Sequence, residues 1–278
     1  AGNQYVFGDA VQTGSIKSQL ENPDLKWETT TELNVGLDFG FLNNRITGSF
    51  EYFHKVVSDL LAFRKLNSLM EVSTIADNIG ATQSTGYEFS LNTVNLTGPF
   101  KWNTTLNISS YNDRWKERNP DVVLAPYEKE DAPIRAIYGC VSDGILQIGE
   151  TPPASMPDLL PGQMKVKDLN GFDPNDGSKL LGHPDGKIDA ADRIYLGSTD
   201  PKVIIGFGNM FEYKNFDLNI FFYGMFGQYV ANSNRAKYGP SGCEYILQRQ
   251  NYSKEVLERW TPDNPTNKFP SGFYSAYY

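Results

Sequence analysis

Cysteine and histidine are scarce in this sequence. Only two cysteines, Cys140 and Cys243, occur among 278 residues, so no disulfide framework holds the fold together. One bridge in an oxidising compartment and two separate, partly buried thiols both agree with this count. The two histidines are His54, in an alternating segment, and His183, in a polar loop. Neither lies in a nucleophile elbow or a metalloprotease motif, and no glycine-rich loop precedes a helix, so we expect a protein that is not an enzyme.

Positive charge and long apolar runs are also limited. The 25 Lys and Arg residues are outnumbered by 33 Asp and Glu residues, which gives a formal net charge of -8 at pH 7. This balance excludes the basic surface of a general nucleic-acid-binding protein. No apolar stretch approaches the ~20 residues that a membrane-spanning helix needs. Membrane-spanning strands stay compatible with the sequence, because such strands alternate apolar and polar residues.

Alternation of apolar and polar residues is the main feature that is present. Aromatic residues make up 13% of the chain and glycine contributes 25 residues, a mixture that favours strands and turns. Three segments each contain an alternating run, a tight polar turn and a second alternating run. They predict β-hairpins at about 30–60, 85–112 and 202–230.

The connections between these segments fall into two classes. The turns within the hairpins are a few residues long, whereas the segments at about 62–83, 113–201 and 231–278 are long. This segregation is typical of outer-membrane barrels, and a β-sandwich has no physical reason to show it. We therefore predict an all-β fold, an antiparallel transmembrane β-barrel segment with short periplasmic turns and long extracellular loops.

Several motifs resemble one protein family. The runs ENPDLKWETT at 21–30 and LDFGFLNNRITG at 37–48 resemble the ENPxLKWE and GLDFGFLNNRxTG motifs of SusC/RagA-type TonB-dependent outer-membrane transporters of Bacteroidetes. Further similar motifs follow in the family's order: GYE at 86–88, DGILQ at 143–147, PGQMK at 161–165, DLNG at 168–171, DGKID at 185–189 and GFGN at 206–209. The resemblance extends over nearly the whole chain.

The resemblance implies a function and partners. Members import oligosaccharides or oligopeptides across the outer membrane, and the lipid of that membrane surrounds them. A SusD-like surface lipoprotein would close the extracellular mouth, and the TonB complex would supply energy through an N-terminal region. The resemblance also implies that residues 1–278 are a later part of one barrel domain, without the TonB box and the plug.

Substrate would be held by side chains of the loops that face the lumen. Aromatic residues are the candidates, because they stack on sugar rings, although packing of loops against one another explains them equally well. The candidates are Tyr111, Trp115, Tyr127, Tyr138 and Tyr238.

An acidic segment matches half of a calcium-binding loop. Residues 185–192 fit the second half of a D-x-N-x-D-G-x-I-x-x-x-D pattern, and 168–170 fit the first half. Calcium needs six to eight oxygen ligands, and this pattern wraps them around one point. The insertion 171–184 separates the two halves, so a calcium site is expected only if the insertion loops out; otherwise the carboxylates form a solvated turn. The expected ligands are Asp168, Asn170, Asp185, the carbonyl of Lys187 and Asp192, with Asp173 and Asp176 as substitutes.

One short helix is predicted in the last loop, near Ser253 to Trp260. Ser253 suits the N-cap, and Val256, Leu257 and Trp260 would share one face at helical spacing. In the transporter interpretation this face either docks a surface lipoprotein or packs against its own loop.

A soluble, secreted β-sandwich-type protein that binds glycans through aromatic platforms is the alternative. Recovery of the protein with detergent-extracted outer membrane favours the barrel. Recovery of a cooperatively folding monomer in plain buffer favours the soluble alternative.

Overall fold

The structure is a computed structural model that describes residues 3–14, 20–67, 69–70, 72–234 and 252–272. Its regular elements in these ranges are strands and short helical turns, among them the 3-10 helices η1 (Ala190–Asp192) and η3 (Lys254–Glu258). The all-β prediction is confirmed. Across the described ranges, none of the helices has the length and apolar character to cross a membrane.

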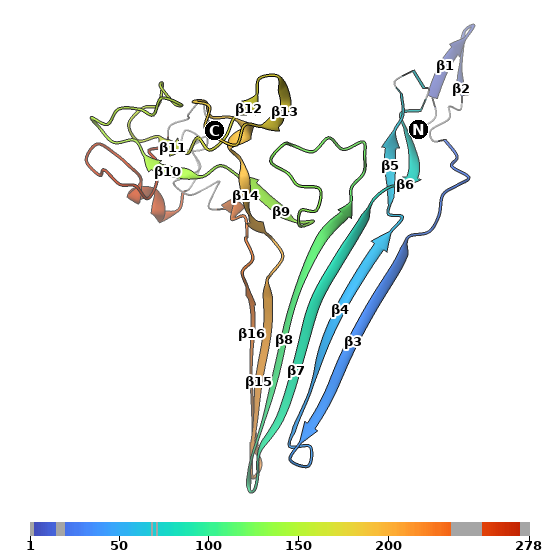
Figure 1. Ribbon diagram of the computed structural model, residues 1–278, viewed down its shortest axis with the longest axis vertical. Coiled ribbons are helices and arrows are strands. Elements are labelled where there is room, and N and C mark those ends of the chain that lie inside the picture. Colours follow the sequence, from blue (N-terminus) through green and yellow to red (C-terminus); the bar gives the residue numbers. More distant parts are fainter. Residues whose placement is uncertain (1–2, 15–19, 68, 71, 235–251, 273–278) are drawn as a thin grey trace. The chain divides into compact units, whose positions relative to one another are not determined.

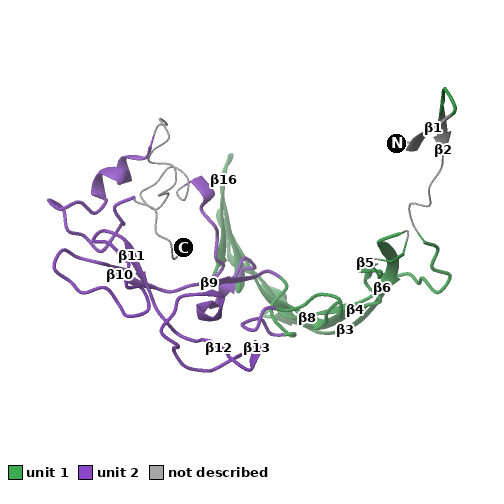
Figure 2. Cartoon of the chain, turned by 90° about the horizontal axis from the view of Figure 1, so that it is seen from above, with its two compact units in different colours: residues 1–124, 130–134, 202–226 green, residues 125–129, 135–201, 227–278 purple. Residues whose placement is uncertain are grey.

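The chain divides into two compact units (Figure 2). The first contains residues 1–124, 130–134 and 202–226, and the second contains residues 125–129, 135–201 and 227–278. Most of the second unit therefore lies, in sequence, between two strands of the first.

The first unit contains a six-stranded antiparallel sheet in the order β16-β15-β8-β7-β4-β3. Its strands are β3 (Thr29–Phe41), β4 (Ile46–Ser58), β7 (Ala81–Thr97), β8 (Phe100–Glu117), β15 (Val203–Tyr213) and β16 (Phe216–Phe226). All six have at least 11 residues, well above the ~5–6 residues common in globular sheets. Neither β3 nor β16 pairs with a further strand in the described part of the chain, so the barrel is not closed.

Short turns join the strands of each hairpin at one end of this sheet (Figure 1). Leu42, Asn43 and Asn44 have φ values of 55°, 55° and 63°, and Lys214 has φ 54°. Asparagine tolerates this left-handed region better than most residues. The polar turns seen in the sequence therefore reverse the chain tightly.

The long connections contain strands of their own. Between β4 and β7, strands β5 (Leu61–Lys65) and β6 (Thr74–Asn78) pair as a small hairpin. Near the N-terminus, β1 (Asn3–Phe7) pairs with β2 (Ala10–Gly14). Strands β7 and β8 are longer than the segment in which apolar and polar residues alternate. Their pairing continues through polar residues, such as Gln83 opposite Arg114.

The second unit contains three short antiparallel pairs. They are β9 (Ala136–Gly139) with β14 (Ile194–Ser198), β10 (Ser142–Ile145) with β11 (Met164–Val166), and β12 (Phe172–Asp173) with β13 (Asp176–Leu180). A small core of Leu146, Met156, Leu159 and Val166 packs against Ile188. This unit therefore has its own packed interior.

The predicted helix in the last loop is a five-residue 3-10 helix, η3. The prediction that Val256, Leu257 and Trp260 share one apolar face is wrong. Val256 and Trp260 are buried, but Leu257 is 76% exposed. A 3-10 helix has three residues per turn, and η3 ends at Glu258, so Trp260 lies beyond it. Ser253 occupies the N-cap position, but its side chain makes no capping hydrogen bond.

Candidate functional site

One face of the six-stranded sheet carries most of the apolar side chains of its strands. The alternating residues meet in cross-strand rows, one of which is Leu37, Phe50, Phe89, Ile108 and Ile205. Many of these side chains are exposed; Leu37, for example, is 65% exposed. An exposed apolar surface as large as a sheet is a liability in water and is the normal outer surface of a membrane barrel.

The opposite face is mainly polar on β3, β4, β7 and β8 and carries acidic groups there, whereas β16 presents Phe221, Tyr223 and Met225 on this face. One of its rows contains Gly36, Glu51, Glu88 and Ser109. In the next row towards the short turns, the hydroxyl oxygens of Ser49 and Ser90 lie 2.8 Å apart. In a barrel this polar face lines the lumen.

Two shallow pockets open on the polar face. The larger, about 430 Å³, is lined by residues that include Glu32, Lys55 and Asp113. The smaller, about 350 Å³, is lined by residues that include Asn107 and Tyr223. Glu51 and Glu88 line both pockets and lie directly opposite one another on β4 and β7. Like charges in this position repel, so the lumen side of this sheet has a locally negative surface.

Two of the predicted substrate residues lie on this sheet rather than in a loop. Tyr111 and Trp115 belong to β8, which extends to Glu117. Tyr111 is opposite Gly86, and Trp115 is opposite Thr82. Both side chains belong to the polar face.

Two others come together in the second unit. The ring centroids of Tyr127 and Tyr138 are 5.3 Å apart, and Tyr138 is 6.0 Å from Tyr195. Arg193 lies over Tyr127 at 6.0 Å and donates a hydrogen bond of 3.4 Å to its hydroxyl. This hydrogen bond raises the pKa of the Arg193 guanidinium above its usual value. Tyr195 and Arg193 are not among the residues predicted from the sequence, because β14 is too short to show a clear alternation.

The other candidate residues are one tyrosine, the two cysteines and the two histidines. Tyr238 and Cys243 lie outside the described residues, and Cys140 is exposed. His54 shares a hydrogen bond of 2.8 Å with the Thr85 hydroxyl on the apolar face. The exposed His183 has its Nδ1 3.0 Å from the carbonyl oxygen of Pro184.

The insertion in the calcium-like segment does loop out. It forms the β12–β13 hairpin, closed at its base by a hydrogen bond of 2.8 Å from Leu181 N–H to the Gly171 carbonyl. Asp168 then accepts hydrogen bonds from the backbone N–H groups of Asp185 (3.3 Å) and Gly186 (2.8 Å). The two halves of the pattern therefore lie side by side.

Backbone groups occupy the acceptors of this segment. Asp192 is completely buried, and its carboxylate accepts N–H groups from Leu169 (2.7 Å), Asn170 (3.2 Å) and Asp189 (2.8 Å). The Asn170 side chain accepts from Gly171 and Gly182, and Asp185 accepts from Lys187. Asp173 and Asp176 accept hydrogen bonds within the hairpin. In the described ranges, no group of three His, Cys, Asp or Glu side chains is arranged to hold a metal ion.

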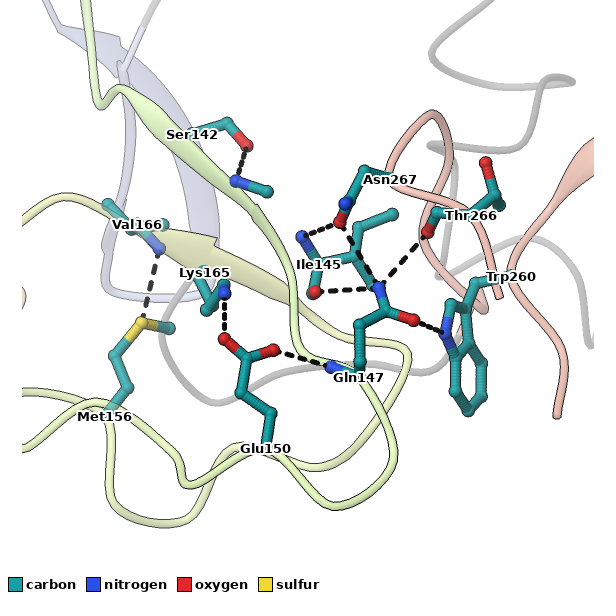
Figure 3. Close-up of polar contacts among 11 residues, drawn as sticks. Ser142, Ile145, Gln147, Glu150, Met156, Lys165, Val166, Trp260, Thr266 and Asn267 are labelled. Atoms are coloured by element: carbon teal, nitrogen blue, oxygen red, sulfur yellow. Dashed lines mark hydrogen bonds and ion pairs between the residues drawn. The ribbon is translucent and has the colours of Figure 1, made fainter. Parts of the chain in front are cut away.

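A polar network in the second unit joins the segment after β10 to the last described segment (Figure 3). The Trp260 indole donates a hydrogen bond of 2.9 Å to Oε1 of Gln147. Nε2 of Gln147 donates to the carbonyl of Ile145 and to Oδ1 of Asn267, which also accepts the Ile145 N–H. Gly162 packs so closely against Trp260 that a Cβ would overlap the indole.

A second part of this network is ionic. The Glu150 carboxylate accepts from the Lys165 ammonium and from the Gln147 N–H. The hydrogen bond from Lys165 lowers the pKa of Glu150 below its ordinary value of 4.5. These contacts hold the β10–β11 connection in one conformation.

Comparison with known proteins identifies the family. Residues 1–155 match the family model "TonB dependent receptor-like, beta-barrel". The chain belongs to the TonB-dependent receptor family. Barrels of this family are outer-membrane proteins, so the chain is part of an outer-membrane barrel. TonB-dependent receptors are transporters and receptors rather than a class of enzymes.

Curated TonB-dependent receptors share about a third of the residues. TonB-dependent receptor P3 of Formosa agariphila is 31% identical over 95% of this chain, and TonB-dependent receptor SusC of Bacteroides thetaiotaomicron is 30% identical over 91%. The chain spans about a quarter of these relatives, 26% and 25% of their lengths. The resemblance to SusC-type members is therefore confirmed.

Solved structures show the same fold. The RagAB peptide importer in its open-open state matches 97% of the chain with a TM-score of 0.70 at 19% identity, over 28% of that protein's chain. Another structure, of the RagAB peptide transporter, matches 98% with a TM-score of 0.67, also at 19% identity and over 29% of that chain.

Proposed function

We propose that the chain forms part of the wall and extracellular loops of a SusC-like, TonB-dependent importer of oligosaccharides or oligopeptides. The observation that carries the proposal is the two-faced sheet, with an exposed apolar face and a polar face that bears two pockets. Such a sheet separates lipid from an aqueous path.

The partners follow from the family. A SusD-like surface lipoprotein would cover the extracellular mouth, and the TonB complex would supply energy. The long connections that contain β5–β6 and β9–β14 leave the strands at the ends opposite the short turns. They would provide the surfaces that meet the lipoprotein and the substrate.

Transport by cells tests this proposal. Deletion of the gene in the bacterium that carries it should abolish uptake of either labelled oligosaccharides or labelled oligopeptides. Deletion of tonB should have the same effect, and the affinity-tagged protein should co-purify with a lipoprotein from detergent-extracted outer membrane. Unchanged uptake of both substrate classes in the deletion strain would contradict the proposal.

A further inference from the structure

A third pocket, of about 280 Å³, lies in the first unit where β8 leads into its long connection. Most of its wall is apolar, and its lining includes Leu60, Ile79, Trp115 and Val122. Glu28, Arg118 and Asn119 also line it. Its Val122 is 53% exposed to solvent, so apolar surface is accessible there.

Backbone hydrogen bonds fix the walls of this pocket. Leu60 is held by two of these hydrogen bonds. Its N–H donates to the Gly80 carbonyl (3.2 Å), and its carbonyl accepts from the N–H of Ile79 (2.9 Å). The N–H of Leu61 donates to Oε1 of Glu28 (3.1 Å). The N–H of Val122 donates to the Asn119 carbonyl (3.0 Å), which closes a turn. The pocket is therefore preformed, as ligand sites usually are.

The sheet register places the pocket on the lumen side. Trp115 lies opposite Thr82, which lies opposite Val57. This row follows directly after the row of Lys55, Ser84 and Asp113, which lines the pocket of about 430 Å³ on the polar face. Trp115 therefore lies on the polar face at the end of β8 that leads into the long connection.

The chemistry of the pocket favours an apolar group. Arg118 lies over the Trp115 ring at 5.5 Å, so a cation covers part of the aromatic surface on which a sugar would stack. Apart from Glu28 and Asn119 the rest of the wall is aliphatic, so it offers a sugar few hydrogen-bond partners. The volume of about 280 Å³ lies at the lower end of the ~300–1,000 Å³ of small-molecule sites, and it has room for one large side chain.

The charges beside the pocket suit a peptide backbone. Glu28 and Arg118 have opposite signs, so neither a cationic nor an anionic side chain is favoured. A peptide offers an N–H donor and a carbonyl acceptor on either side of each side chain. An apolar side chain in the pocket would bring such groups near these two residues.

We propose that this pocket binds one uncharged aliphatic or aromatic side chain of an oligopeptide that enters the lumen. This inference rests on the import function proposed above and narrows its substrate class to peptides with an apolar residue.

Peptide binding by the protein purified from outer membrane tests the proposal. The probes are two dye-labelled hexapeptides that differ only in one central residue, leucine or serine. The wild type should bind the leucine peptide about tenfold more tightly, the scale of discrimination that apolar pockets achieve. Val122→Asp should remove this preference, and so should Val122→Phe, which fills the pocket without adding charge.

Val123→Asp is the matched control. Val123 is the next residue, is 94% exposed and does not line the pocket, so this variant should keep the wild-type preference. Equal binding of both peptides by the wild type, or an unchanged preference in both Val122 variants, would overturn the proposal.

Uptake by cells separates this inference from the import function. Import of oligosaccharides with no binding of either peptide would leave the import function intact and overturn the pocket assignment. Absence of uptake of both substrate classes would instead contradict the import function itself.

Discussion

The ring of Phe53 on β4 lies against Gly86 of β7, its register partner in the sheet. A Cβ on Gly86 would be 2.5 Å from Cζ of Phe53 and 2.7 Å from the carbonyl oxygen of Ser110. The missing side chain therefore makes room for an aromatic ring on the polar face, next to Tyr111, which is opposite Gly86 on the other side. This arrangement fixes one strand against the next by shape.

Gly86→Ala should destabilise the barrel. The new methyl group meets backbone as well as the Phe53 ring, so strands must shift, and overpacking of this kind costs about 1–3 kcal/mol. Urea unfolding of the full-length protein in lipid vesicles measures the change in free energy of unfolding. Gly98→Ala is the control, because a Cβ there meets nothing within 4 Å. Equal stability of the two variants would show that the Phe53–Gly86 contact does not constrain the sheet.

Asp192→Asn should loosen the segment around residues 168–192. In the wild type, three backbone N–H groups donate to the two oxygens of the Asp192 carboxylate. Asparagine keeps only one oxygen, and its NH₂ group is a donor that cannot accept a hydrogen bond from an N–H group. Leaving a buried donor unsatisfied costs about 1–3 kcal/mol. Hydrogen exchange should rise about tenfold or more at Leu169, Asn170 and Asp189, since 1.4 kcal/mol corresponds to a factor of ten. Asp185→Asn, at an exposed position, should leave exchange at Leu169 and Asn170 unchanged; a similar rise in both variants would contradict this account.

The sequence allowed the large strands to be predicted because each has one lipid face and one lumen face. Period-two alternation records that difference directly, as in Leu37 and Asp38. The short strands of the second unit, such as β12 with two residues, carry too few residues to show a period. Their positions depend on contacts between distant segments, such as the hydrogen bond between Trp260 and Gln147, which are 113 residues apart.

The site residues were predicted less completely for the same reason. Tyr127 and Tyr138 are predicted as candidates because they are aromatic residues in a loop. Tyr195 is not predicted, because only the pairing of β9 with β14 places it next to Tyr138. The apolar alternation ends before β8 does, so the sequence predicts a loop at Trp115. Asp192 is a buried acceptor of backbone N–H groups. No local pattern in the sequence distinguishes this role from that of a calcium ligand.

Calcium binding by Asp168, Asn170, Asp185, the Lys187 carbonyl and Asp192 stays a prediction. The insertion 171–184 loops out, as a calcium site requires. A bound ion would have to compete with backbone N–H groups for the carboxylate oxygens of Asp168 and Asp192. Calcium near 1 mM, in the range of extracellular sites, should protect residues 168–192 of the full-length protein from proteolysis. Asp168→Asn should remove this protection. No protection up to about 10 mM calcium would reject the site.

Acid should weaken the β10–β11 connection through Glu150. Its pKa is lowered by the Lys165 hydrogen bond, so the ionised form stabilises the folded state above pH 4.5 and this contribution is lost as pH falls below that value. Glu150→Gln should be more protease-sensitive than the wild type at pH 7, and the difference should shrink as the pH falls below 4.5. Asp143→Asn, whose pair with Lys167 spans 3.8 Å, should show a smaller difference at pH 7. A difference between Glu150→Gln and the wild type that did not change with pH would contradict this role.

The assignment of the two sheet faces is the central claim, and Leu37 and Asp38 test it most directly. These neighbours on β3 belong to opposite faces, so a nitroxide label is attached to a single cysteine at one or the other position after Cys140 and Cys243 are replaced by serine. With the full-length protein in lipid, the label at Leu37 should collide mainly with oxygen dissolved in the bilayer, and the label at Asp38 mainly with a water-soluble nickel complex. Equal access of the nickel complex to both labels, in a protein recovered from the soluble fraction, would contradict the account.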